Sequence, residues 1–157
     1  MIMQRVSSTM LKSIEEGNVD TTIELDSHAD SPVVGNGATI IKKTGRTVSV
    51  SGFTDRLGKA IRIQVANACY VYGDDKDGKV YIMMIRNALH ILEMEACLIP
   101  PIMMRLAGLT VDECSKFLSA SPSIANHSIY FNDEQIWIPL KLDGVISYMP
   151  CQSLNAS

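Results

Sequence analysis

Apolar and polar positions alternate with a period of two over most of the chain. Between residues 61 and 65, every second residue is isoleucine or valine, and the residues between them are Arg62 and Gln64. Alternation of this kind puts successive side chains on opposite faces of a β-strand. We expect such strands at residues 22–25, 38–42, 46–53, 60–65, 68–72, 79–85, 88–92, 109–111, 127–131, 135–142 and 145–149. Many short strands at regular spacing predict an all-β barrel or sandwich.

Turn-forming residues separate these runs. The dipeptide TG at residues 44–45 lies between the second and third predicted strands, and DDKDG at residues 74–78 has the composition of a hairpin loop. Residues 132–134 and 143–144 divide the last strands in the same way. Glycine, aspartate and asparagine favour these positions because they tolerate left-handed backbone or bond to their own turn.

Two segments depart from the strand pattern. Residues 101–107 begin with Pro101 and are followed by Gly108, which is the usual order of these residues at the two ends of a short helix. Residues 1–20 carry apolar residues at a four-residue spacing that ends at Gly17. This first segment is either a short helix or a weakly ordered lead-in.

The length of 157 residues suits one domain, which buries roughly 70% of the surface of its unfolded chain. The formal net charge of −3 provides no overall attraction for a phosphate backbone. A small basic patch at Lys42, Lys43 and Arg46 is better explained as a solvated strand end than as a nucleic-acid contact. We therefore expect no direct nucleic-acid partner.

The four cysteines are widely spaced and form no CxxC pair or Cys/His ligand set, which argues against a structural zinc site. Cys69 and Cys97 stand in apolar strands and are expected to be small buried residues. The first 20 residues lack the apolar stretch of a secretory leader, and the apolar run at residues 97–104 is short and contains two prolines. These features predict an intracellular, cytoplasmic protein without a membrane partner.

The stretch ELDSHADSPVVG at residues 24–35 carries the strongest chemical signal. Asp26 follows a predicted strand, the hydroxyl of Ser27 comes next, and Asp30 follows two residues after His28. To cleave a peptide bond without a metal, Asp26 would need a second catalytic carboxylate about 3 Å away, and two carboxylates this close cannot both ionise, so they share one proton. The ionised member takes a proton from water while the protonated member donates to a substrate carbonyl, which is general acid–base catalysis. Such chemistry needs an aspartate on a tight turn at a strand end, and Asp26 has that position.

Residues 25–34 resemble the active-site turn of the retropepsins, the retroviral-type aspartic proteases, whose pattern is L-D-[ST]-G-A-D followed at short distance by a branched apolar pair. The matching positions are Leu25, Asp26, Ser27, Ala29, Asp30, Val33 and Val34. Residues 87–111 are similar to a block of copia-type retrotransposon proteases, and residues 127–150 resemble the segment after the protease in copia-like polyproteins. Together these matches cover residues 23–150.

The resemblance implies a retropepsin-like acid protease barrel with one short helix and extra C-terminal strands. It divides the chain into a lead-in at residues 1–20, a protease core at residues 21–110 and a strand-rich extension at residues 111–157, which packs on the core or follows it. The implied function is an aspartic endopeptidase that processes a retrotransposon polyprotein, in the cytoplasm or in a virus-like particle. No cofactor and no metal are implied.

The roles of single residues carry over by their position in the motif. Asp26 is then the catalytic aspartate, Ser27 and His28 support the turn, and Ala29 and Asp30 bind the backbone of an extended polypeptide substrate. The D-[ST]-x-A-D pattern occurs once in the chain. A pair of catalytic aspartates therefore requires a homodimer, with both Asp26 side chains on its two-fold axis.

Two details of the resemblance leave alternatives open. His28 stands where retropepsins have glycine, so its imidazole either intrudes on the substrate backbone and strains the turn or adds a titrating group beside the catalytic pair. The flap that closes over substrate is expected within residues 60–73, with the hairpin at residues 68–85 as the competing choice.

Other functions are also compatible with the sequence. Asp26, His28 and Asp30 alternate, and with His90 or His127 they would bind a divalent ion that activates water, although the proline-containing stretch favours a turn over a shared strand face. A serine or cysteine nucleophile has no G-x-S-x-G or Cys/His signature here. The runner-up is a retropepsin fold without catalysis that serves as a dimerisation module.

Overall fold

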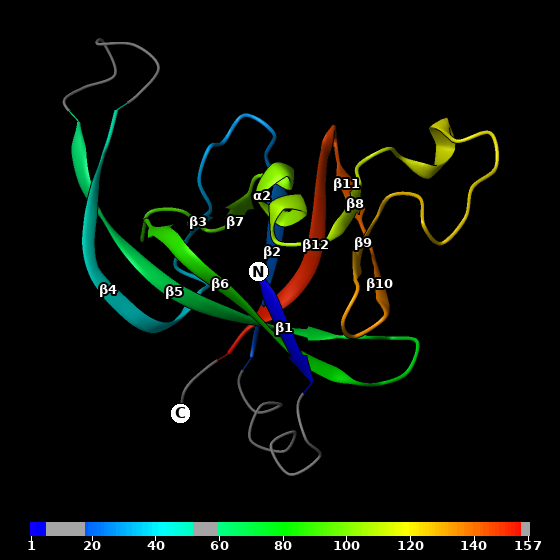
Figure 1. Ribbon diagram of the computed structural model, residues 1–157, viewed down its shortest axis with the longest axis horizontal. Helices are drawn as coiled ribbons and strands as arrows, with labels where there is room; N and C mark the ends of the chain where they lie inside the picture. The colour runs from blue at the N-terminus through cyan, green and yellow to red at the C-terminus, as the bar shows by residue number, and fades with distance from the viewer. Residues whose placement is uncertain (6–17, 52–59, 155–157) are drawn as a thin grey trace.

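The computed structural model describes residues 1–5, 18–51 and 60–154 (Figure 1). Most of these residues lie in strands, so the predicted all-β class is confirmed. The larger sheet contains β1 (Ile2–Arg5), β2 (Val19–Leu25), β3 (Val33–Val34), β4 (Thr39–Val50), β5 (Ile61–Gly73), β6 (Val80–His90), β7 (Cys97–Ile99), β11 (Lys141–Asp143) and β12 (Ile146–Ser153). The smaller sheet contains β8 (Thr110–Asp112), β9 (Ser128–Phe131) and β10 (Ile136–Pro139). The described part also has the helix α2 (Pro101–Leu106) and the 3-10 helix η2 (Lys116–Leu118).

The strands of the larger sheet pair in the order β1-β6-β3-β7-β2-β12-β5-β4, and β11 pairs with β12. β5 also pairs with β6. Each strand in the series β6, β3, β7, β2, β12 and β5 therefore pairs with the next one, and the last pairs with the first. β7 runs parallel to β2, and β3 lies between β6 and β7. The segment that follows β2 is therefore held in the interior of the sheet, while β4 lies at its edge.

β4 corrects one prediction from the sequence. It covers residues that were expected to form two strands, at 38–42 and from 46 onward, with a turn at residues 44–45. Lys43 lies opposite Ala66 and Thr47 lies opposite Gln64, so β4 has two extra residues between these pairs. Gly45 has a left-handed φ of 78° and takes up the extra length as a bulge. A glycine that predicts a turn can therefore also keep an irregular strand continuous.

β5 and β6 each join two predicted strands. In β6 the irregularity falls at Asn87, which has a φ of 57° and whose backbone N–H donates to Oδ1 of Asn67 at 3.0 Å. The loop predicted at residues 74–78 does connect the two strands, and Oδ1 of Asp74 accepts the N–H of Lys76 at 3.0 Å. The loop predicted at residues 74–78 is therefore confirmed. The gaps predicted within β5 and within β6 are instead bulges in continuous strands.

One buried apolar cluster joins the two sheets. Its members include side chains from β2, β5, β6, β9 and β12, among them Ile23, Tyr70, Met83, Ile129 and Met149, none of which is more than 1% exposed. Each large apolar side chain buried in this way contributes about 1.5–3 kcal/mol to the free energy of unfolding. The smaller sheet and β12 are thus parts of one core with the strands that precede them.

The helix predicted at residues 101–107 is confirmed, because α2 begins at Pro101 and ends at Leu106. At the N-terminus, residues 2–5 form β1, which pairs with β6. The alternative of an N-terminal helix with Val6, Met10 and Ile14 falls on residues 6–17, which lie outside the described residues.

The predicted strand at residues 135–142 is divided at Leu140. Its first part is β10 in the smaller sheet, and its second part is β11 in the larger one. The buried Leu140 donates its backbone N–H to the carbonyl of His127 at 2.9 Å where the chain crosses between the sheets. β12 then pairs with β2, beginning with Tyr148 opposite Glu24. The end of the chain therefore supports the strand that leads to Asp26.

Candidate functional site

The turn at residues 26–31 is held by strands on both sides. The backbone N–H of Asp26 donates to the carbonyl of Ile99 in β7 at 3.2 Å. Beyond the turn, the carbonyl of Pro32 accepts the N–H of Leu89 at 2.8 Å, and β3 pairs with both β6 and β7. Fixed backbone on each side is what a catalytic carboxylate needs in order to keep one orientation.

The carboxylate of Asp26 lies over its own turn. Its Oδ1 accepts the backbone N–H of His28 at 2.9 Å, and the Asp26 carbonyl accepts the N–H of Ala29 at 3.4 Å. The Asp26 side chain is 36% exposed, so it is anchored but still open to a substrate.

His28 and Ser27 complete this cluster. Nδ1 of His28 lies 3.9 Å from Oδ1 of Asp26 and 3.5 Å from Oγ of Ser27, and the His28 side chain is 90% exposed. Its φ is not among the positive values of the described chain, so this turn does not require glycine at position 28. The backbone strain expected from a non-glycine residue at this position is therefore absent, and the imidazole of His28 lies beside the Asp26 carboxylate.

A cavity of about 630 Å³ opens beside this turn. The turn contributes Asp26, His28, Ala29, Asp30 and Ser31 to the cavity lining, with Leu89 of β6 beside the turn, and the other wall consists of Val48, Ser49, Val50 and Ser51. Four of the five predicted site residues therefore line one cavity, and Ser27 is the exception. The residues on the other wall carry no recognisable motif, and only the three-dimensional fold identifies them.

The position of the cavity bears on the choice of flap. Residues 61–73, expected to hold the flap hairpin, form the single strand β5, which pairs with β4 on one side and β6 on the other. The loop between β5 and β6 lies at the far end of these strands from the β4–β5 connection (Figure 1). Val48, Ser49 and Val50 of β4, with Ser51 directly after it, are the residues of the β4–β5 hairpin that line the cavity at Asp26. Residues 52–59, at the end of this hairpin, lie outside the described residues.

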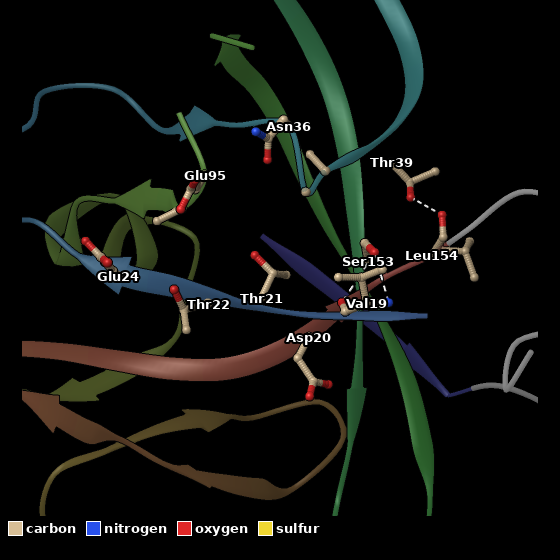
Figure 2. A pocket seen from close by; sticks show the side chains of 13 residues that line it. Val19, Asp20, Thr21, Thr22, Glu24, Asn36, Thr39, Glu95, Ser153 and Leu154 are labelled. Carbon is tan, nitrogen blue, oxygen red and sulfur yellow. Dashed lines mark hydrogen bonds between the residues drawn. The ribbon is translucent and has the colours of Figure 1, made fainter. Parts of the chain in front are cut away.

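A somewhat larger hollow, of about 700 Å³, lies along β2 nearer to its start (Figure 2). Its lining includes the acidic residues Asp20, Glu24 and Glu95, together with neutral polar residues such as Asn36 and Thr39. The hydroxyl of Thr39 donates to the carbonyl of Leu154 at its rim (Figure 2). None of the motif residues from Asp26 to Asp30 lines this hollow, so we assign the candidate site to the cavity at Asp26.

The alternative of a metal site receives no support from side-chain positions. Over residues 1–5, 18–51 and 60–154, no three His, Cys, Asp or Glu side chains come together as a ligand group. Asp26, His28 and Asp30 lie on a turn and so do not share one strand face. His127 is buried, and its Nε2 bonds to Oγ of Ser147 at 2.9 Å. A histidine at the start of a predicted strand is expected at the surface, but His127 is buried and connects the residues next to β9 to Ser147 of β12.

His127 leads to a prediction about pH. Burial lowers the pKa of His127, with Asp112 opposing and Lys116 reinforcing the shift. The unfolded chain then binds this proton more readily, so the free energy of unfolding is expected to fall as the pH drops below about 6.5. His127→Gln should reduce this loss, because glutamine does not titrate and can still bond Ser147. Urea unfolding at neutral and mildly acidic pH measures the effect, with His28→Gln as the exposed control. An identical pH dependence in wild type and His127→Gln would contradict the expectation.

The cysteines behave as small buried residues, as predicted for Cys69 and Cys97. Both are buried, and burial raises the pKa of Cys97 to about 12. Cys151 is also buried with a raised pKa, while Cys114 is exposed. A buried thiol with a raised pKa is a poor nucleophile. These residues do not provide a competing catalytic centre.

No match was found when the chain was compared with protein-family models, with curated proteins and with solved structures. The site is therefore interpreted from its own geometry and from the motif at residues 25–34. Neither helix of the described part has the length and apolar character that a membrane crossing requires.

Proposed function

We propose that this protein is a retropepsin-like aspartic endopeptidase that acts as a homodimer. The observation that carries the proposal is the Asp26 turn itself. A half-exposed carboxylate is fixed by the N–H of His28 and by β7, and it faces a cavity whose other wall is an edge strand. Carboxylates in such a position act as general acids and bases once a second carboxylate shares their proton.

In the proposed mechanism, one Asp26 comes from each of two chains. With the two carboxylates about 3 Å apart, a single proton is shared between them. The ionised Asp26 removes a proton from water, the water oxygen attacks the peptide carbon, and the protonated Asp26 donates its proton to the carbonyl oxygen. The tetrahedral intermediate then breaks at its C–N bond as the amine takes up a proton.

The substrate is proposed to be an extended polypeptide, and by the motif resemblance a retrotransposon polyprotein. Among the strands of the described residues, β4 pairs with β5 alone, so its other edge has backbone donors and acceptors available for a further strand. Residues 48–50 of β4, followed by Ser51, line the same cavity as Ala29 and Asp30. A peptide between them would bond to β4 on one side and to the Asp26 turn on the other.

The dependence on two chains provides the test. The specific activity of the purified chain on an unfolded polypeptide substrate is expected to rise with protein concentration and to follow the dimer fraction measured by sedimentation. A chelator should leave this activity unchanged. Activity that persists in a strictly monomeric sample would refute the shared pair, and activity that a chelator removes would refute metal-free catalysis.

The second candidate function is the same fold without turnover, and the imidazole of His28 in the cavity favours it. A dimer that cleaves no substrate between acidic and neutral pH, but cleaves after His28→Gly, would identify the imidazole as the obstacle. The wild-type chain would then be a dimerisation module.

A further inference from the structure

The Asp26 turn has an exposed apolar element on each side. On one side is the end of the β11–β12 hairpin, where Leu142 is 38%, Val145 96% and Ile146 45% exposed. Asp143 lies opposite Ile146, so the hairpin has a two-residue loop, and Gly144 with a φ of 60° occupies its first position. Val145 occupies the second position, where no part of the described chain covers it.

The pairing register places this hairpin end beside the catalytic turn. Tyr148 of β12 lies opposite Glu24 of β2, and β12 begins two residues earlier, at Ile146. Continuing the antiparallel register brings Ile146 level with Asp26 and Val145 level with Ser27. Adjacent strands are about 5 Å apart, so the hairpin end is one strand spacing from the turn.

The other side of the turn carries α2. Leu25 lies opposite Ile99 in the parallel pair of β2 and β7, and α2 begins two residues after Ile99. Ile102 is 55% and Leu106 75% exposed on this helix. β7, β2 and β12 lie side by side in that order (Figure 1). The Asp26 turn is thus centred between two apolar elements.

We propose that the second copy of this chain docks through these two elements, with the hairpin end of each copy against α2 of the other. The inference rests on the proposed function, because two Asp26 carboxylates that share a proton must lie within about 3 Å of each other across a two-fold axis. A two-fold axis can pass through the turn at right angles to the line from the hairpin end to α2. It then places the hairpin end of one copy against α2 of the other. Val145 and Ile146 of one chain then meet Ile102 of its partner, and the same contact recurs by symmetry.

Of the terminal strands, β12 is paired along both edges, whereas β1 pairs on one edge within the described residues and, unlike the elements beside Asp26, presents no exposed apolar group for docking among its described side chains. β1 is paired with β6, and β12 is paired with β2, β5 and β11 within its own chain. The two apolar elements beside Asp26 are by contrast solvent-exposed in the single chain. A second copy is the occupant that both covers them and supplies the missing carboxylate.

A charge exchange between the two elements tests the interface. Val145→Asp and Ile102→Lys are each expected to raise the dimer dissociation constant at least about 100-fold, because each leaves an unpaired charge in an apolar contact. The double variant should recover most of this loss, since each Asp then meets a Lys of the partner. Leu118→Asp and Leu92→Lys, at residues 70% and 63% exposed elsewhere, are the matched controls. Sedimentation gives the dissociation constants, and circular dichroism verifies folding.

Cross-linking provides a second readout that needs milder substitutions. Val145→Cys with Ile102→Cys, in a Cys114→Ser background, should yield a disulfide-linked dimer under a mild oxidant. Within one chain these positions lie on opposite sides of β2, about 10 Å apart by strand spacing, which exceeds the reach of a disulfide. The corresponding variant with Leu118→Cys in place of Val145→Cys should not cross-link.

The outcomes separate this interface from the proposed function. A wild-type dimer that survives both single charge variants, or that the double variant does not restore, overturns the interface and leaves the dimeric protease intact. A wild-type chain that is monomeric at every concentration overturns both. An active dimer that dissociates and recovers as described establishes the contact.

Discussion

Asp26→Asn is expected to abolish peptide hydrolysis, with a fall in kcat of about 1,000-fold or more, because an amide cannot take the proton from water. The substitution keeps the shape of the side chain, and its remaining oxygen can still accept the N–H of His28. The fold and the dimer should therefore be unchanged. The measurement is kcat on a polypeptide substrate, with the exposed loop variant Asp75→Asn as the control. Undiminished hydrolysis by Asp26→Asn would end the assignment of Asp26.

Mixing this variant with the wild-type chain tests whether the active unit contains two copies of Asp26. In an equilibrated mixture, dimers with two native aspartates form in proportion to the square of the wild-type fraction. Specific activity is expected to follow that square if both carboxylates are needed. A linear dependence would instead indicate that one chain contains a complete site.

Gly35→Ala is expected to be the most destabilising small substitution in the described chain. A Cβ at Gly35 would lie 2.2 Å from the backbone oxygen of Met94 and 3.0 Å from that of Ala96. Both atoms belong to backbone that cannot rotate away, so the segment that follows β3 would have to move. We expect a loss of roughly 3 kcal/mol or more in the free energy of unfolding, at the upper end for overpacking.

Urea unfolding followed by circular dichroism measures this loss. The control is Gly73→Ala at the end of β5, because a Cβ there would meet nothing within 4 Å. Since Gly35 follows β3 directly, Gly35→Ala should also displace the Asp26 turn and lower activity at temperatures where the variant is still folded. Equal urea midpoints for Gly35→Ala and wild type would show that the segment is free to shift.

The sequence predicted the elements that depend on neighbouring residues. The helix at residues 101–107 and the hairpin loop at residues 74–78 appear where proline and glycine placed them, and the turn expected at residues 143–144 is a loop of Gly144 and Val145. Alternation identified most of the strand residues, although β4, β5 and β6 each join two predicted strands and the predicted strand at residues 135–142 is divided. The bulge at Gly45 was misread as a turn, because a left-handed glycine serves equally well in either. The partner strand decides between the two, and that choice is not local.

Only the residues of the Asp26 turn could be predicted as part of the candidate site from the sequence. The residues on the turn follow one another from Asp26 to Asp30, so a motif can identify them. Val48, Val50 and Leu89, which also line the cavity, come from β4 and β6 and have no distinctive pattern. Likewise, no local signal marks Ile99 as the acceptor for the N–H of Asp26. Contacts between distant segments depend on packing that the local pattern does not encode.

By itself, the sequence determined the all-β class, the short helix and the turn with its single Asp26, because backbone preferences and side-chain periodicity act over a few residues. The tertiary structure alone decided that β12 lies between β2 and β5, that the β4–β5 hairpin faces the turn, and that His127 is buried against Ser147. These outcomes depend on which apolar faces pack together. Many strands share the same alternating pattern, so the pattern alone does not determine which strands become neighbours. The single chain therefore carries a complete turn but only one of the two carboxylates that the proposed chemistry requires.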